Sequence, residues 1–304
     1  MPGADEIAAL KRRMGRVGVW NSTLGGESAV FEQEAAAEVE SLGFGTLWVG
    51  ETPSGKEALT HAALLLGGTR RLTVATGIAN IWARDATAAA NGANTLAESS
   101  GGRFVLGLGV SHAPLVSQRG HDYRKPVSAM REYLDAMDAT DYTGPLPEPA
   151  PRLLAALRPK MLELAARRAY GAHPYFVPPE HTARARTVLG PLPVLAPEQT
   201  VLVETDPERA RRTARRFMAL YLALPNYVNN LRDLGWPEED LAGGGSDALV
   251  DAIVAWGEPE TIIARVRAHL DAGADHVCVQ PLADSPRAML EHLRTLAAAD
   301  LTSL

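Results

Sequence analysis

Residues 72–112 read LTVATGIANIWARDATAAANGANTLAESSGGRFVLGLGVSH, and this stretch decides the fold. A β-branched and apolar run ends at 76–80 in Thr-Gly-Ile-Ala-Asn, an alanine-rich helical pattern follows, and a second apolar run begins at Arg103. The pattern predicts strand, helix and strand, with glycine and polar residues gathered where each strand ends. Because the functional residues of parallel α/β barrels lie at the carboxyl ends of the strands, the same stretch also indicates where a site would be.

The rest of the chain continues this alternation of strand and helix patterns. Alternation of this kind implies a parallel sheet, and eight units predict an α/β protein that closes into a (β/α)8 TIM barrel with short insertions. We expect one barrel domain over residues 1–304, with a proline-rich connection at 143–151 and an irregular helical insertion at 221–245. The expected strands are 17–20, 46–50, 72–78, 103–108, 152–157, 172–177, 199–204 and 275–280.

A doubly wound open sheet is the structural alternative. The dinucleotide-binding fingerprint of that fold is missing, because His112 stands where the third glycine of a G-x-G-x-x-G motif opening at Gly107 should be. The sequence therefore favours the barrel.

Composition excludes several classes of function. The chain has 304 residues, of which 46% are hydrophobic and 22% charged, and its net charge is -6, so no basic surface for nucleic acid is expected. No apolar run approaches the roughly 20 residues that cross a bilayer, and the first residues lack the apolar core of a signal peptide. We expect a cytoplasmic protein with neither a membrane nor a nucleic-acid partner. The single cysteine, Cys278, lies in a predicted strand and excludes a cysteine metal cluster.

Two strand ends carry residues suited to ligand binding. Gly77 follows a predicted strand, and glycine there marks a bulge or a close backbone approach, which a flat aromatic cofactor needs. The run from Gly107 to His112 exposes backbone N–H groups, and Ser111 and His112 add donors, the imidazole being able to shuttle a proton near neutral pH. The alternatives are an ordinary strand terminus and a surface histidine.

Other candidates are less specific. Glu51 and Thr52 follow the strand at 46–50, where a carboxylate could act as acid or base, or could lie in a solvated loop. Residues 174–181 precede a helix whose N–H groups attract phosphate, but two prolines remove donors there. No H-x-x-x-H pair, G-x-S-x-G elbow or G-x-x-x-x-G-K loop occurs, so we expect no metal site and no nucleotide hydrolysis.

Three motifs in order carry a family resemblance. They are Gly43-Phe44-x-x-Leu47-Trp48-Val49-x-Glu51, Ala75-Thr76-Gly77-Ile78-x-Asn80-Ile81 and Gly102-Arg103-Phe104-x-Leu106-Gly107-Leu108-Gly109. Over residues 15–300 the chain resembles the luciferase-like monooxygenase superfamily, and within it the coenzyme F420-dependent oxidoreductases. The resemblance implies a barrel that holds F420, a deazaflavin hydride carrier, at its carboxyl mouth. It also implies a bulge after the third strand, often with a non-proline cis peptide.

The resemblance also implies roles for single residues. His112 is the first candidate for the proton donor and Glu51 the second. Trp20, Thr52 and Trp82 would wall a substrate pocket, and core packing is the alternative role of the two tryptophans. Relatives that oxidise sugar phosphates carry an Asp-His pair where this chain has Glu51-Thr52, and a glutamate where it has His112, so we do not expect that substrate. The residues that would contact the cofactor are Thr76, Gly77, Ile78, Ala79, Asn80, Gly109, Val110, Ser111, Phe176 and Val177.

The sequence therefore predicts an F420-dependent oxidoreductase that transfers a hydride to or from a small organic substrate, and relatives suggest a homodimer. The alternatives are an FMN-dependent monooxygenase, since both cofactors present a flat tricycle and a phosphate, and a barrel homologue without catalysis.

Overall fold

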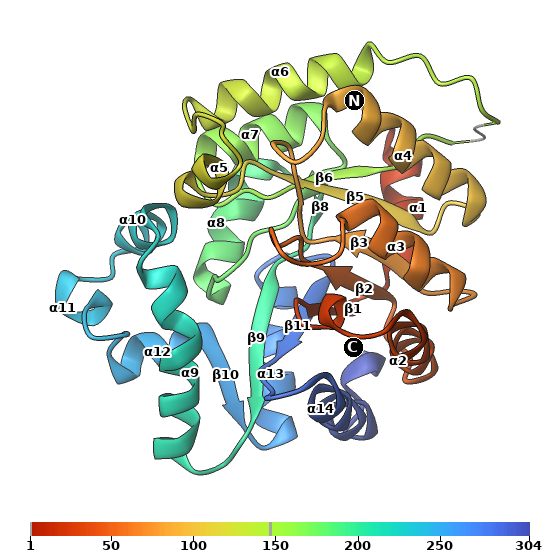
Figure 1. The fold of residues 1–304 in the computed structure, drawn as a ribbon. Helices are drawn as coiled ribbons and strands as arrows, with labels where there is room; N and C mark the ends of the chain where they lie inside the picture. The colour runs from red at the N-terminus through yellow and green to blue at the C-terminus, as the bar shows by residue number, and fades with distance from the viewer. Residues whose placement is uncertain (1, 146–147) are drawn as a thin grey trace.

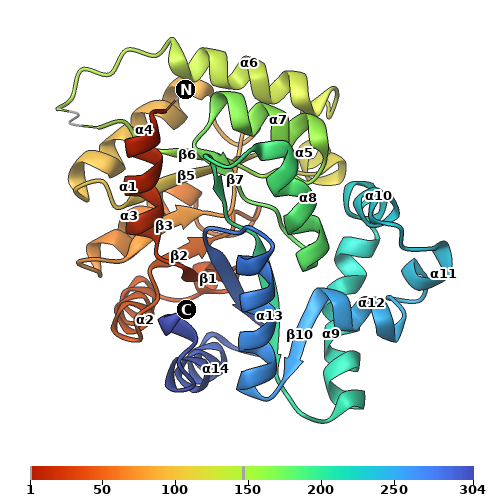
Figure 2. The same cartoon turned by 180° about the vertical axis from the view of Figure 1, so that it is seen from behind.

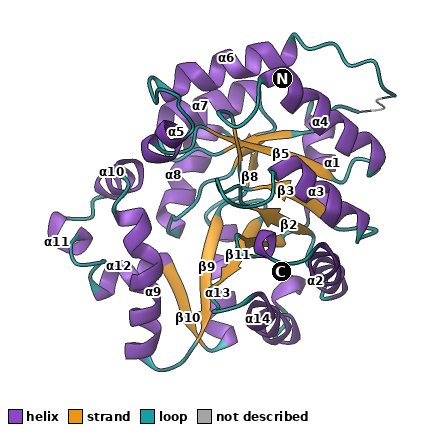
Figure 3. Ribbon diagram, in the orientation of Figure 1, coloured by secondary structure: helices purple, strands orange, loops and turns teal. Residues whose placement is uncertain are grey.

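The computed structural model describes residues 2–145 and 148–304, and residues 146 and 147 of the expected proline-rich connection lie outside it. Within the described residues, a central sheet of eleven strands runs in the order β10-β9-β11-β1-β2-β3-β5-β6-β7-β8, with β4 paired to β5 (Figure 3). Every pair in this sheet is parallel. The strands are β1 (Val17–Asn21), β2 (Thr46–Val49), β3 (Thr73–Thr76), β4 (Ala79–Asn80), β5 (Phe104–Gly109), β6 (Arg152–Leu154), β7 (Gly171–Ala172), β8 (Val194–Leu195), β9 (Glu198–Val203), β10 (Val254–Gly257) and β11 (Val277–Pro281).

Helices surround this sheet, and α9 to α12 project to one side of it (Figure 1). Local chemistry sets many of their starts: the Asp85 carboxylate accepts the N–H of Ala88 at 2.8 Å, and a proline occupies the first turn of α9 and of α14. The described helices are α1 (Ala4–Met14), α2 (Ala29–Ser41), α3 (Ala58–Gly67), α4 (Ala86–Ser99), α5 (Ala113–Gln118), α6 (Pro126–Asp138), α7 (Pro159–Arg168), α8 (Pro179–Leu189), α9 (Pro207–Leu222), α10 (Pro225–Leu234), α11 (Glu238–Leu241), α12 (Asp247–Ile253), α13 (Pro259–Asp271) and α14 (Pro286–Ala298), with 3-10 turns at Leu24–Gly26 and Leu301–Ser303.

The sheet is curled. At one end of its path β8 pairs with β7, and near the other end β9 pairs with β11, yet only Ala196 and Pro197 separate β8 from β9 along the chain. The two edges of the sheet are therefore joined by the short connection between β8 and β9. The predicted parallel α/β organisation is confirmed, and the fold is TIM-barrel-like.

Side chains fill the interior of the curl. One cluster of buried residues joins α1, through Ile7, Leu10 and Met14, to apolar side chains of seven strands. The helix α1, which lies in front in Figure 2, is anchored by the Thr46 hydroxyl, whose Oγ1 donates to the carbonyl of Met14 at 2.8 Å. The strand side chains of this cluster are Trp20, Trp48, Ala75, Val105, Leu153, Val194 and Cys278. Cys278 is fully buried, as expected from its place in a strand.

Several sequence predictions need correction. The strand expected at 172–177 is only Gly171–Ala172, because Pro174 offers no N–H to a ladder and Phe176 adopts a left-handed backbone with φ of 60°. The strand expected at 72–78 breaks after Thr76, and the chain rejoins the sheet as β4. The short strands β8 and β10 and the helices α1 and α5 were not predicted. The irregular helical insertion expected at 221–245 is present as α10 and α11.

No helix within the described ranges is both long enough and apolar enough to span a membrane.

Strands β3 and β5 approach each other so closely that only glycine fits at position 107, and this can be tested by substitution. A Cβ added at Gly107 would lie 1.9 Å from the carbonyl oxygen of Thr76, so one backbone must move. We expect Gly107→Ala to lower the free energy of unfolding by about 1–3 kcal/mol or more, measured by urea unfolding. Gly26→Ala is the matched control, since nothing lies within 4 Å of its added Cβ. Equal stability of the two variants would contradict the packing described here.

Candidate functional site

The most distinctive backbone in the structure lies between β3 and β4. The Gly77-Ile78 peptide is cis, as the family resemblance implies, and these two residues are the only members of 72–81 that are not buried. Gly77 donates its N–H to the carbonyl of Val49 at 2.8 Å and accepts from the indole Nε1 of Trp20 at 3.1 Å. We call residues 77 and 78 the bulge; it presents accessible backbone at the carboxyl end of the sheet.

Glycines on β5 make room for the bulge. A Cβ at Gly109 would lie 2.4 Å from Cδ1 of Ile78, so the Ile78 side chain rests directly on the Gly109 backbone. On the other side, a Cβ at Gly77 would lie 2.4 Å from Nε1 of Trp20. At both positions glycine is needed because a neighbouring side chain occupies the place of a Cβ, and not because the backbone turns there.

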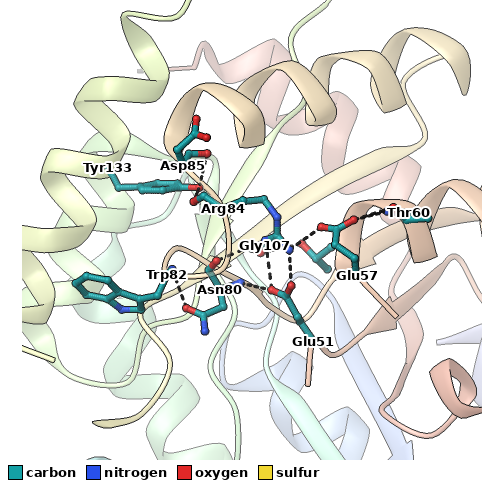
Figure 4. Close-up of polar contacts among 10 residues, drawn as sticks. Glu51, Glu57, Thr60, Asn80, Trp82, Arg84, Asp85, Gly107 and Tyr133 are labelled. Atoms are coloured by element: carbon teal, nitrogen blue, oxygen red, sulfur yellow. Dashed lines mark hydrogen bonds and ion pairs between the residues drawn. The ribbon is translucent and has the colours of Figure 1, made fainter. Parts of the chain in front are cut away.

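A buried ion pair holds the chain that follows the bulge (Figure 4). The Glu51 carboxylate accepts the N–H of Asn80 at 2.7 Å and pairs with both terminal nitrogens of Arg84. Arg84 also contacts Glu57 Oε1 at 2.6 Å. Burial acts to lower the pKa of Arg84, but the hydrogen bonds and charges of the two glutamates outweigh it and raise the pKa. Glu51 thus anchors the segment after β3, and its role as a proton donor stays a prediction.

Trp82 continues this network toward β5. Its backbone N–H donates to Oδ1 of Asn80 at 3.0 Å, and its indole donates to the carbonyl of Val110, also at 3.0 Å. The tryptophan therefore ties the segment after β4 to the loop after β5, which carries His112.

Aromatic side chains from distant parts of the chain gather beside the bulge. The Trp20 ring lies 5.0 Å from that of Tyr175, Phe176 stacks on Tyr221 at 5.0 Å, and Tyr221 lies 5.2 Å from Tyr227. We call these five residues the aromatic cluster. They come from β1, from the segment after β7, and from α9 and α10, so the insertion covers part of this end of the sheet.

His112 reaches the aromatic cluster from the loop after β5. Its ring lies 5.5 Å from that of Tyr227. Burial lowers the pKa of His112, and a hydrogen bond with Asn226 only partly opposes the effect. The imidazole is therefore neutral at pH 7, a form that can accept a proton.

Two buried ionisable groups near the bulge had no predicted role. Glu198 is 1% exposed, and its Oε2 accepts the N–H of Phe176 at 3.1 Å while its Oε1 accepts the hydroxyl of Thr200 at 2.6 Å. Burial raises its pKa to about 7, against the effect of both hydrogen bonds. Glu198 has no cation partner among residues 2–145 and 148–304, and a carboxyl group buried in this way beside tyrosines is a candidate for function. The only signal in the sequence is a charged residue at the head of an apolar strand.

His173 is the second such group. It stacks on Trp48 at 4.3 Å, and its Nδ1 donates to the carbonyl of Ala196 at 2.7 Å. Nε2 is buried, has no partner among the described residues, and lies 3.4 Å from where a Cβ of Gly77 would be. Burial lowers the pKa of this histidine to about 4, so a neutral imidazole with a free acceptor lies behind the bulge.

The remaining predicted residues occupy varied positions. Val110 and Ser111 are half-buried in the loop after β5, and Thr52 is exposed in a turn that its carbonyl closes with the N–H of Gly55 at 3.2 Å. Phe176 packs in a hydrophobic cluster with α9, α10 and α12, and its contact with a cofactor remains a prediction. The buried members of the predicted cofactor-binding set are Thr76, Ala79, Asn80, Gly109, Phe176 and Val177.

A groove of about 720 Å³ lies elsewhere, on the outer face of α9. Its charged lining residues are Glu208, Arg211, Arg212, Arg215, Arg216 and Asp247, and Asp247 forms ion pairs with Arg211 and Arg215. Because this groove is lined by α9, by Gly243 and Gly244 and by the start of α12, and not by the carboxyl ends of the strands, we place the candidate site at the bulge instead. No group of three or more metal-ligating side chains occurs among the described residues.

Comparisons with known proteins bear on the family and the fold of this chain. The family profile described as luciferase-like monooxygenase matches residues 14–276. A Mycobacterium tuberculosis protein named as a coenzyme F420-dependent oxidoreductase is 39% identical over 103 residues, which span 34% of this chain and only 29% of that protein.

Two solved structures resemble the fold. The coenzyme F420 dependent tetrahydromethanopterin reductase of Methanopyrus kandleri has a TM-score of 0.76 at 17% identity, covering 94% of this chain and 99% of that one. The FMN-bound oxygenating constituent of 3,6-diketocamphane monooxygenase from Pseudomonas putida has a TM-score of 0.70 at 15% identity, covering 93% and 96%. At these identities the likeness establishes the fold alone.

The buried ion pair can be tested by removing its cation. Arg84→Met leaves Glu51, whose side chain is 4% exposed, without its partner, so we expect a loss of about 3 kcal/mol in the free energy of unfolding. Arg294→Met is the matched control, because Arg294 pairs with Glu38 at the surface and its loss should be far smaller. Similar losses in urea unfolding for both variants would show that Arg84 does not hold this segment.

The raised pKa of Glu198 predicts a pH-dependent cost of burial. The folded-state pKa of about 7 lies above the ordinary 4.5, so stability from this group is present below pH 4.5 and is lost as pH rises through 7. Relative to Glu198→Gln, the native protein should therefore lose on the order of 3 kcal/mol between those limits. The measurement is urea unfolding at several pH values, with exposed Glu34→Gln as control. A difference that is independent of pH would refute the assignment.

Proposed function

The chain belongs to the luciferase-like monooxygenase family, and on that premise we propose that it is an oxidoreductase dependent on coenzyme F420. It transfers a hydride between F420 and a small organic substrate, on a closed (β/α)8 barrel that forms one domain. The observation that carries this proposal is the accessible backbone of Gly77 and Ile78 at the carboxyl end of the sheet. The homodimer and the cytoplasmic location expected from the sequence belong to the same proposal.

The residues at the bulge fit a flat ring. Gly77 has no side chain to hold a ring away from the backbone, and Ile78 turns its side chain onto Gly109. Val110 and Ser111 follow β5 in the next loop and are only half-buried. These residues would hold the cofactor, which supplies the hydride donor or acceptor when bound.

The chain's own residues supply position and proton chemistry. The Glu51–Arg84 pair keeps the segment after the bulge in place, so the backbone that faces the ring is preorganised. His112 is neutral at pH 7 because burial lowers its pKa, and it can take the proton released when a substrate is oxidised. In the opposite direction it returns that proton.

An FMN-dependent monooxygenase is the competing function, because a relative of the same fold binds FMN. Titration of the purified protein with F420 and with FMN separates the two, followed by tryptophan fluorescence and by equilibrium dialysis. Trp20, whose indole contacts Gly77, should report ligand at the bulge. We expect F420 to bind at least tenfold more tightly than FMN. The reverse order favours the monooxygenase, and failure of both to bind favours a barrel without catalysis.

A variant of β5 locates the binding surface. In Gly109→Ala the new Cβ would come within 2.5 Å of two side-chain atoms of Ile78, so the Ile78 side chain would have to move and change the shape of the bulge. We expect F420 affinity to fall about tenfold or more, while Gly26→Ala leaves it unchanged. Undiminished affinity in a folded Gly109→Ala protein would mean that F420 binds elsewhere.

A further inference from the structure

The groove on the outer face of α9 has the dimensions of a small-molecule site. Its volume of about 720 Å³ falls within the range of roughly 300–1,000 Å³ that such sites span in proteins. One wall is α9, and the other is the loop of Gly243 and Gly244 with Asp247, the first residue of α12. These elements project from the sheet in Figure 1, so the groove is a candidate binding site separate from the bulge.

Positive charge is concentrated on this helix. Residues 207–222 contain five arginines and one glutamate, whereas the whole chain has a net charge of -6. Four of the arginines line the groove together with two carboxylates, so the lining carries an excess of two positive charges. A concave surface with an excess of one charge attracts ligands of the opposite charge. The groove is therefore suited to an anion.

Two of the four arginines are already engaged and join the walls of the groove. Arg211 forms ion pairs with Asp247 and Asp251, at 2.9 and 2.5 Å. Arg215 pairs with Asp247 and donates from its Nε to the carbonyl of Gly245 at 2.9 Å. These contacts hold the loop before α12 against α9.

The other two arginines, Arg212 and Arg216, form no ion pair among residues 2–145 and 148–304. The guanidinium of Arg216 donates once, from Nη2 to the hydroxyl of Thr213 at 3.2 Å. Both arginines are exposed and lie four positions apart, which places their Cβ atoms roughly 5–6 Å from each other on one face of the helix. A guanidinium bonds a phosphate through two parallel N–H groups. The pair can therefore hold two phosphate groups that are linked to each other.

The facing loop offers further hydrogen-bond donors. Within the part of the chain that the structure describes, the N–H groups of Gly243 and Gly244 have no hydrogen-bond partner. Both residues have positive φ, of 60° and 87°, and neither has a side chain to keep a ligand from the backbone. A phosphate that lies between α9 and this loop can therefore be bonded from two sides.

From this arrangement we propose that the groove binds a small molecule through a pyrophosphate group, with Arg212 and Arg216 each bonding one phosphate. The N–H groups of Gly243 and Gly244 donate to the same group from the opposite wall. Glu208, which also lines the groove, lies one turn before Arg212 and competes with the ligand for that guanidinium. A nucleic acid fits poorly, because its many phosphates would meet a chain with a net charge of -6.

Three anions test the ligand class by equilibrium dialysis, with the protein alone, at one ionic strength and without divalent cations. They are inorganic pyrophosphate, orthophosphate and a hexa-aspartate peptide. We expect pyrophosphate to bind at least about tenfold more tightly than orthophosphate, because only pyrophosphate engages both guanidinium groups at once. Equal affinity for the two phosphates would indicate attraction by charge alone and would overturn the proposal. Tighter binding of the peptide would also overturn it and would indicate an acidic protein segment as the ligand.

Substitutions on α9 locate the site. We expect Arg212→Gln and Arg216→Gln each to weaken pyrophosphate binding about fivefold or more. The matched control is Arg131→Gln, which should leave binding unchanged, since Arg131 is exposed on α6 and likewise forms no ion pair among the described residues. Glu208→Gln removes the competing carboxylate and should strengthen binding about threefold.

All four of these residues are exposed, so their substitution leaves the core intact. If the two groove variants bind pyrophosphate as tightly as Arg131→Gln, the proposal is wrong. Because no arm of the experiment contains F420, its result is independent of the function proposed above.

Discussion

The candidate site depends on one buried contact, the Glu51 carboxylate with the N–H of Asn80 and the guanidinium of Arg84. After Thr76 the chain leaves the regular ladder, and a backbone that does so needs other partners for its polar groups. Glu51 supplies one of them, and Arg84 compensates the charge that this brings into the protein. Without that compensation a carboxylate could not lie at 4% exposure beneath the rim of the sheet.

Two glycines of β5 provide the space in which the bulge lies, beside the segment that Glu51 and Arg84 hold. Gly107 lets β5 approach Thr76, and Gly109 receives the side chain of Ile78. Between these contacts Gly77 and Ile78 are half-buried, whereas Thr76 and Ala79 on either side of them are buried. Rigid strands thus hold an exposed piece of backbone, which is the requirement for binding a flat ring without side chains in between.

The insertion gives this site its chemical character. Helices α9 and α10 bring Tyr221 and Tyr227 over the carboxyl end of the sheet, where they meet Phe176 and Tyr175. These rings come from segments far apart in the sequence, and their contacts make this part of the site aromatic. Family membership accounts for the barrel-like frame.

By itself, the sequence determined the parallel α/β organisation and the position of the bulge, because alternating hydrophobic periods and a glycine just past a strand are local signals. It also singled out Trp20, His112 and Trp82: the indole of Trp20 contacts Gly77, that of Trp82 contacts Val110, and the ring of His112 lies beside Tyr227. Only the tertiary structure decided that Glu51 pairs with Arg84, that Glu198 supports Phe176, and that Tyr175 meets Tyr221. Each of these contacts joins residues more than 20 positions apart, and its energy depends on burial. Periodicity reports which face of an element is apolar, but it does not report which distant element covers that face.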